Sequence, residues 1–308
     1  MFPILLLYII IYGFTIGYLQ LKVTEITYES PTVPKAFDGY RIAQISDIHT
    51  GGGFMGPYHG LMDKAVKKVN DLKPDMICVT GDLQNFLPTE TEQFTKELSS
   101  LHAPDGVFSI MGNHDYCSYS NLTPSEQGKQ IQKTRDLQKQ FGWTLLQDEN
   151  RTIKHGEDSI IVVGEENWGL PPFPQRGNIK KAVKGLNINP ATKQVDSTLV
   201  LMLSHDPNAW EHHIRKVINP DITLSGHTHG TQFSFLGWCP ASLAYKYWGG
   251  EYHSKRDKKI DINAKANRKP FPTDDLMLYV STGFGGNLPF RFGMPREIVV
   301  LTLKHKDK

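Results

Sequence analysis

The stretch Leu224-Ser225-Gly226-His227-Thr228-His229-Gly230 decides how the rest of the chain is interpreted. The apolar run Ile222-Thr223-Leu224 predicts a buried strand, which Ser225-Gly226 ends. His227 and His229 then follow at the carboxyl end of that strand, one residue apart. Open α/β sheets bind ligands outside the carboxyl ends of their strands, and imidazole is the commonest metal ligand. The stretch therefore favours two metal ions, one for each histidine. The alternative is a polar loop in which the histidines only form caps.

Other apolar runs are also followed by groups that could bind metal. They predict strands over residues 40–45, 76–80, 106–111 and 199–203. Helical spacing over 62–72 and 90–101 separates the first three, which is the βαβ pattern of a mainly parallel sheet. The carboxyl ends of such strands share one edge, so the polar groups after them are expected to meet there. These groups are Asp47, His49, Asp82, Asn113 and His205.

The residue types in this set indicate the kind of ion. Carboxylates, imidazoles and one amide provide more ligands than a single tetrahedral ion needs. Two ions about 3.5–4 Å apart, bridged by one carboxylate, would use all of them. Oxygen and nitrogen ligands without thiolate suit Mn, Fe or Zn in a catalytic site. The chain has 3 cysteines and no CxxC spacing, which supports neither a structural zinc site nor a disulfide framework.

Composition limits the class of protein. The chain has 308 residues, a formal net charge of +2 and 39% hydrophobic residues. It can therefore build a sizeable core, and long-range disorder is not indicated. The near-neutral charge argues against a nucleic-acid partner and against a nuclease. No linker divides the chain after its first segment, so one globular domain is expected over residues 22–308.

Residues 1–21 contain no charged side chain and predict a transmembrane anchor. A helix of this length would just cross a hydrocarbon core of about 30 Å at about 1.5 Å per residue. The alternatives are a buried core helix and a signal peptide, although no small-x-small cleavage site follows. Lys22, Lys35 and Arg41 come after the segment and favour the cytoplasmic face for the globular part.

Five motifs in order resemble the calcineurin-like metallophosphoesterase superfamily. They are Asp47-Ile48-His49, Gly81-Asp82, Gly112-Asn113-His114-Asp115, His205 after a strand, and Gly226-His227-Thr228-His229. Each motif alone is weak evidence, but the ordered set is highly specific. The resemblance implies a mixed α/β fold, a four-layer αββα sandwich of two mixed sheets, here preceded by the N-terminal helix.

The resemblance also implies a role for each matching residue. One ion would be held by Asp47, His49, Asp82 and His229. The other would be held by Asp82, Asn113, His205 and His227, so that Asp82 bridges the pair. His114 would face the substrate and stabilise the phosphoryl group or protonate the leaving oxygen, with Asp115 orienting its ring. Arg291, in Leu288-Pro289-Phe290-Arg291, resembles the ending of the membrane-associated bacterial branch and would contact substrate phosphate. The alternative for Arg291 is an ordinary surface arginine.

The expected function is a membrane-anchored phosphoesterase with two divalent metal ions. It would hydrolyse phosphodiester or pyrophosphate bonds by attack of a metal-bridging hydroxide. The substrate would be a phosphorylated small molecule or a lipid-linked one, since some relatives cleave UDP-2,3-diacylglucosamine. The alternatives are a catalytically silent binding scaffold and a phosphomonoesterase or protein phosphatase. The aromatic residues 233–252 have two interpretations, a membrane-facing rim or packing around the metal loops. The basic residues 255–269 predict a solvated loop.

Overall fold

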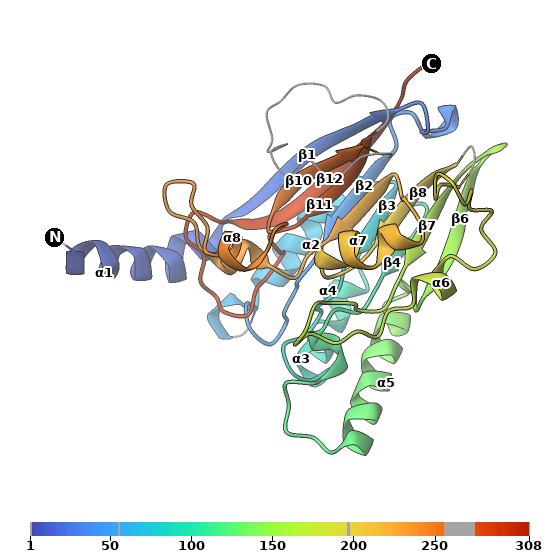
Figure 1. Ribbon diagram of the computed structural model, residues 1–308. Helices are drawn as coiled ribbons and strands as arrows, with labels where there is room; N and C mark the ends of the chain where they lie inside the picture. Colours follow the sequence, from blue (N-terminus) through green and yellow to red (C-terminus); the bar gives the residue numbers. More distant parts are fainter. Residues whose placement is uncertain (1, 55, 196–197, 256–274, 308) are drawn as a thin grey trace.

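Two six-stranded sheets form the centre of the molecule (Figure 1). The computed structural model describes residues 2–54, 56–195, 198–255 and 275–307, and the predicted basic loop lies almost wholly outside these ranges. The first sheet has the order β1-β12-β2-β3-β4-β5. Its strands are β1 (Leu21–Ser30), β2 (Arg41–Ile45), β3 (Met76–Val79), β4 (Val107–Ser109), β5 (Thr144–Leu145) and β12 (Arg296–His305).

The second sheet has the order β10-β11-β9-β8-β7-β6. Its strands are β6 (Glu149–His155), β7 (Asp158–Gly164), β8 (Leu199–Leu203), β9 (Ile222–Ser225), β10 (Gly250–Lys255) and β11 (Asp275–Val280). Both sheets are mixed: β2 to β5 run parallel, as do β7, β8, β9 and β11, while β12 pairs antiparallel with β2. The prediction of two mixed sheets is confirmed.

The two sheets pack face to face over one apolar core. Ile42, Cys78 and Leu301 from the first sheet are fully buried, and they belong to the same cluster as Leu201 and Leu224 from the second. Successive side chains along a strand point to opposite faces, so the alternate residues of these strands are buried on the outer faces instead. A sandwich of this kind needs a further apolar layer on each outer face.

Helices supply those outer layers. Helices α2 (Leu61–Asp71), α4 (Thr95–Leu98) and α5 (Pro124–Gln140) contribute to the cluster on the first sheet. Helices α6 (Ile179–Ala182) and α7 (Asn208–His212) contribute to the cluster on the second. The layers therefore follow the expected order of helix, sheet, sheet and helix. Two more short helices, α3 (Thr89–Glu92) and α8 (Ala241–Ala244), lie in connections.

Two segments of the globular part differ from the sequence-based expectation. The helix predicted over 90–101 is broken into α3 and α4, because Phe94 leaves the helical region at φ −108° and ψ 15°. Its buried ring packs against Phe54 and His59. Strand β10 was missed; it begins at the end of the aromatic segment 233–252 and pairs antiparallel with β11. α5 begins with a capping box between Thr123 and Glu126.

The N-terminal segment also differs. Regular helix α1 covers Phe2–Tyr12, and Gly13–Gly17 continues it as a π-helical turn. No helix in the described ranges is both long enough and apolar enough to cross a membrane, so the predicted spanning helix is not supported. The two glycines serve close packing: a Cβ on Gly17 would lie 1.8 Å from the Arg291 carbonyl oxygen, and one on Gly13 would lie 2.1 Å from the Phe290 ring. The Arg291 backbone N–H also donates to Gly13 O at 3.0 Å.

Candidate metal centre

All of the predicted ligands lie at the carboxyl ends of strands, and both sheets contribute. Asp47 and His49 follow β2, Asp82 follows β3, and Asn113 follows β4 in the first sheet. His205 follows β8, while His227 and His229 follow β9, in the second sheet. Every one of these residues is buried. Because β2 and β9 end at the same edge of the sandwich, residues far apart in the sequence meet there.

The first group joins Asp47, His49, Asp82 and His229. One ligand atom from each residue lies within 4.8 Å of the others. The His49 Nε2 atom is 3.5 Å from Asp82 Oδ2 and 3.1 Å from His229 Nε2. The His229 Nε2 atom is 3.5 Å from Asp47 Oδ1. Two carboxylates and two imidazoles therefore converge on one point.

The second group joins Asp82, His205 and His227, whose ligand atoms also lie within 4.8 Å of one another. Asp82 Oδ2 is 3.1 Å from His205 Nε2. Asn113 completes the group, because its Oδ1 atom is 3.2 Å from His205 Nε2 and 2.8 Å from His227 Nδ1. Asp82 belongs to both groups, which is the arrangement expected for a bridging carboxylate.

The backbone at the candidate ligands is unusual. Five of them have left-handed φ values, which non-glycine residues seldom adopt. Such a conformation costs on the order of 1–3 kcal/mol per residue and persists only where surrounding structure enforces it. The five are Asp47 (53°), His49 (48°), Asp82 (55°), His227 (74°) and His229 (54°). Strain gathered on the predicted ligands favours a functional role for these turns.

Two histidines are oriented by partners outside the ligand groups. The His205 Nδ1–H donates to the Thr80 carbonyl at 2.7 Å, and His49 Nδ1 is 3.1 Å from Asn85 Oδ1. An oxygen acceptor at Nδ1 fixes a proton there, so that Nε2 is the nitrogen directed at the candidate ion. Partners of this kind determine the tautomer and ring direction of metal-binding histidines.

Burial and charge set the protonation of these groups. Burial lowers the pKa of His49 to about 3 and that of His227 to about 4. Both imidazoles are therefore neutral at pH 7, with lone pairs available to a cation. For His205, burial lowers the pKa, but the Asp82 and Asp47 carboxylates and the Thr80 carbonyl together outweigh it and raise the pKa to about 10, so that a cation at Nε2 would have to displace a proton. The interaction with His205 holds the pKa of Asp82 well below its usual range, against burial.

This donor set fits divalent ions. It consists of buried carboxylate, imidazole and amide groups, whereas the free cysteines Cys78, Cys117 and Cys239 are not members of either group. Carboxylate and imidazole suit Mn, Fe or Zn, and the shared Asp82 suits a pair of ions.

His114 lies beside the two groups and belongs to neither. Its ring is partly exposed and its centroid is 4.7 Å from that of His49. The Nδ1–H donates to the Asn85 carbonyl at 2.7 Å, which leaves Nε2 as the nitrogen that can exchange a proton. The Tyr119 ring lies against its other side at 4.4 Å. The role of His114 in meeting the substrate stays a prediction.

Asp115 does not orient His114, so that expectation is corrected. Its buried carboxylate accepts hydrogen bonds from the backbone N–H groups of Gly112, Asp82 and Leu83 at 2.8–2.9 Å. Asp115 therefore fixes the turn that carries Asp82, while a backbone carbonyl orients His114. Three backbone donors around one carboxylate favour its charged form.

Arg291 is buried and bonded to a loop beside the candidate site. It is 0% exposed, and its guanidinium donates to the carbonyls of Gly283, Gly285, Met294 and Pro295 at 2.7–3.2 Å. All three guanidinium nitrogens are used in this way. Arg291 thus holds the 283–295 loop against the site, and neither the predicted phosphate contact nor the surface alternative matches this position.

Asp206 and Tyr245 are functional candidates that motif reasoning missed. The His227 Nε2 atom is 3.0 Å from Tyr245 Oη and 3.7 Å from Asp206 Oδ2. The Asp206 carboxylate is fully buried, and Oδ2 has no hydrogen-bond partner among the described residues. A negative charge behind the ring makes its other nitrogen a stronger ligand. The only sequence signal was the position of Asp206 directly after His205.

We expect Asp206→Asn to weaken the binding of one of the two ions by about 10–100-fold, as loss of an outer partner does. Calorimetric titration of the metal-stripped protein with Mn²⁺ measures this affinity. Asp136→Asn makes the same chemical change at an exposed position on α5 and should leave both affinities unaltered. Equal affinities in the two variants would remove Asp206 from the site.

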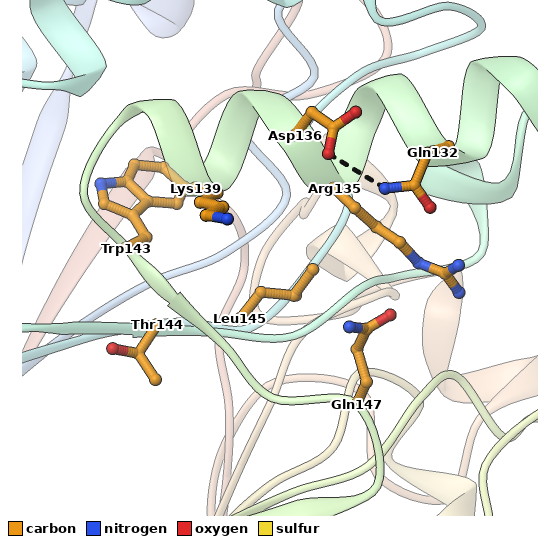
Figure 2. A pocket seen from close by; sticks show the side chains of 8 residues that line it. All are labelled: Gln132, Arg135, Asp136, Lys139, Trp143, Thr144, Leu145 and Gln147. Carbon is orange, nitrogen blue, oxygen red and sulfur yellow. Dashed lines mark hydrogen bonds between the residues drawn. The ribbon is translucent and has the colours of Figure 1, made fainter.

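A separate hollow in the molecule lies away from the candidate metal ligands. It has a volume of about 480 Å³ and lies between α5 and the β5 region (Figure 2). Its lining includes Arg135, Asp136 and Lys139, and Gln132 donates to Asp136 at 3.0 Å. None of the candidate ligands belongs to this lining. Solvated charges on one helix provide no converging metal ligands, so the strand-end site remains the functional candidate.

Comparisons with known proteins agree with this geometry. Residues 40–231, more than half of the chain, match the family model described as calcineurin-like phosphoesterase. The UDP-2,3-diacylglucosamine pyrophosphatase LpxG of Chlamydia trachomatis is 26% identical, over 91% of this chain and 88% of its own. The uncharacterized metallophosphoesterase YkuE of Bacillus subtilis is 27% identical, over 92% and 86%. The "transmembrane protein with metallophosphoesterase domain" of Danio rerio is 23% identical, over 96% and 60%.

Proposed function

Because the chain belongs to the calcineurin-like phosphoesterase family and is a metal-dependent phosphoric ester hydrolase, we propose that it cleaves phosphodiester or pyrophosphate bonds at a two-ion site. The observation that carries the proposal is the pair of ligand groups sharing Asp82. Asp47, His49, Asp82 and His229 would hold one ion. Asp82, Asn113, His205 and His227 would hold the other.

Two divalent ions would lower the pKa of a bound water molecule and would place positive charge next to the phosphate oxygens. The chain's own residues do the remaining work. Asp115 and the strained turns keep the ligands in place before substrate arrives, so little reorganisation is needed. His114 Nε2 is available to donate a proton to the leaving oxygen, with the ring held by the Asn85 carbonyl.

The proposed substrate is a lipid-linked phosphodiester or pyrophosphate. Two observations support this class. LpxG, named as a UDP-2,3-diacylglucosamine pyrophosphatase, is similar over most of both chains. Aromatic rings also flank the candidate site: Phe173 and Tyr245 lie against His227 with centroids 4.5 and 5.6 Å away, and Tyr119 lies against His114. We also propose that the apolar N-terminal segment attaches the protein to a membrane, where such a substrate resides.

The test compares soluble and lipid-linked substrates on the same preparation. We expect metal-stripped protein to be inactive, and added Mn²⁺ or Zn²⁺ to restore hydrolysis of bis-p-nitrophenyl phosphate in preference to p-nitrophenyl phosphate. UDP-diacylglucosamine in mixed micelles is expected to be the better substrate. Preference for the monoester would indicate a phosphomonoesterase, and metal binding without turnover would indicate a scaffold. Either result would contradict the proposal.

A further inference from the structure

Helix α1 exposes apolar side chains on all of its sides. Among its residues, Ile4 is 74% exposed, and Leu7, Tyr8 and Ile11 are each more than half exposed. A helix covered by a protein partner normally has one apolar stripe and one polar face. α1 has no polar face, because residues 2–21 contain no charged side chain. Helix α1 is therefore suited to an environment that is apolar on all of its sides.

A second exposed apolar element lies in the loop 233–243. Phe235 and Trp238 exchange backbone hydrogen bonds at 2.9 and 3.0 Å, which makes a tight turn. Leu236 stands at the tip of this turn and is 92% exposed, and Trp238 is half exposed. Leu243 on α8 is 80% exposed. Turn tips are normally polar, so exposed leucine and tryptophan there mark a contact surface.

One ring joins the loop to the helix. Phe292 contacts Tyr8 and Tyr12 of α1, with ring centroids 6.5 and 5.6 Å away. The same ring stacks on Phe233 and Phe235 at 5.7 and 6.4 Å. Figure 1 shows α1 and the α8 region at the same end of the molecule. The exposed residues of α1 and of loop 233–243 therefore form one apolar surface, although they are more than 200 residues apart in sequence.

The charges around this apolar surface favour a lipid bilayer as its occupant. Residues 2–21, 231–250 and 283–295 contain no aspartate or glutamate. Within or next to these segments, Lys22 is exposed, Lys246 forms an ion pair with Glu211 at 2.7 Å, Glu251 pairs with His253 at 2.6 Å, and Arg291 is buried. An exposed lysine such as Lys22 beside an apolar surface is attracted to anionic lipid headgroups. Trp238 and Tyr8 have the amphipathic rings that lie at the boundary between headgroups and acyl chains.

We propose that loop 233–243 inserts into the bilayer beside α1 and forms a second membrane contact close to the metal centre. The role of this contact rests on the proposed function. The loop begins four residues after His229, so its insertion would hold the ligand edge of the sheets at the lipid surface. A lipid-linked phosphate ester then reaches the site without its acyl chains leaving the bilayer.

The test uses the full chain and vesicles of phosphatidylcholine and phosphatidylglycerol. We expect Leu236→Glu with Trp238→Glu to reduce vesicle binding at least about tenfold in a flotation assay, since two apolar side chains proposed to enter the bilayer become charged. The control adds the same charge at exposed positions on α5, Gln132→Glu with Gln140→Glu, and should bind like the parent. Equal binding by the two double variants would overturn the proposal. A change from dimer to monomer with unchanged vesicle binding would assign the loop to a second copy instead.

A second measurement does not depend on the charged variants folding. Leu236→Cys can be labelled selectively with an environment-sensitive dye, because the three native cysteines are buried. Its emission should shift to shorter wavelength when vesicles are added, and an unshifted spectrum would contradict insertion. Hydrolysis of soluble bis-p-nitrophenyl phosphate, measured without vesicles, should be equal in the parent and both double variants. If the parent itself did not hydrolyse the soluble diester, the proposed function would be wrong. Vesicle binding by the variants would still test the insertion of the loop.

Discussion

Asp82→Asn is expected to remove both metal ions and to lower kcat/KM by at least about 10³-fold. Asp82 belongs to both ligand groups and lies 3.1 Å from His205 and 3.5 Å from His49. The substitution keeps the shape of the side chain and removes its charge. Loss of an outer partner already costs about 10–100-fold in metal affinity, so loss of a shared ligand should cost more at each position. Metal content by mass spectrometry and kcat/KM on a soluble diester measure the two effects.

The Asp82→Asn variant should keep its fold, and Asp136→Asn provides a matched control. Asparagine tolerates the left-handed backbone that Asp82 adopts at φ 55°, so the turn should survive. Asp136→Asn, at the exposed hollow of Figure 2, should retain both ions and full activity. If the Asp82 variant kept two ions per chain, the shared-ligand arrangement would be wrong.

His114→Ala is expected to keep both ions and to lower kcat by about 10²–10⁴-fold, the usual contribution of a general acid. His114 is not a member of either ligand group. Its backbone N–H donates to Asp82 Oδ1 at 2.9 Å, and that bond remains in the variant. The loss should therefore fall on turnover rather than on metal binding, which calorimetry and steady-state kinetics separate.

His102→Ala provides the comparison for His114, because His102 is an exposed histidine that belongs to neither ligand group. It should match the parent in turnover and metal content. Unchanged kcat in the His114 variant would exclude it as the acid. Loss of an ion would show that His114 supports the metal centre instead.

The strand ends were predictable because short apolar runs bounded by turn residues have few other structures. Residues 199–203 form β8 with the predicted bounds, and His205 follows it as expected. The convergence of His205 and Asp82 also followed, since parallel strands share a carboxyl edge. Local pattern and global topology agreed at these positions, which explains the success of motif reasoning there.

The failures concern contacts between segments that are distant in sequence. The burial of Arg291 depends on four carbonyls of a loop whose path no periodicity predicts. Gly13 and Gly17 suit a membrane helix and also suit close packing on residues 290–291, and sequence alone does not choose between them. The motif predicted that Asp115 orients His114, whereas its bonds to three backbone amides depend on the folded turn.

The left-handed turns at the ligands have a consequence for heat resistance. Glycine adopts such φ values without the steric cost that aspartate and histidine incur. An inactive chain with glycine at Asp47 or His227 would relieve local tension and is expected to melt at a higher temperature than the metal-stripped parent. The bound ions would reverse that order by stabilising only the native parent. The metal-free protein would therefore melt at a lower temperature, because its ligand side chains are held in position before the ions bind.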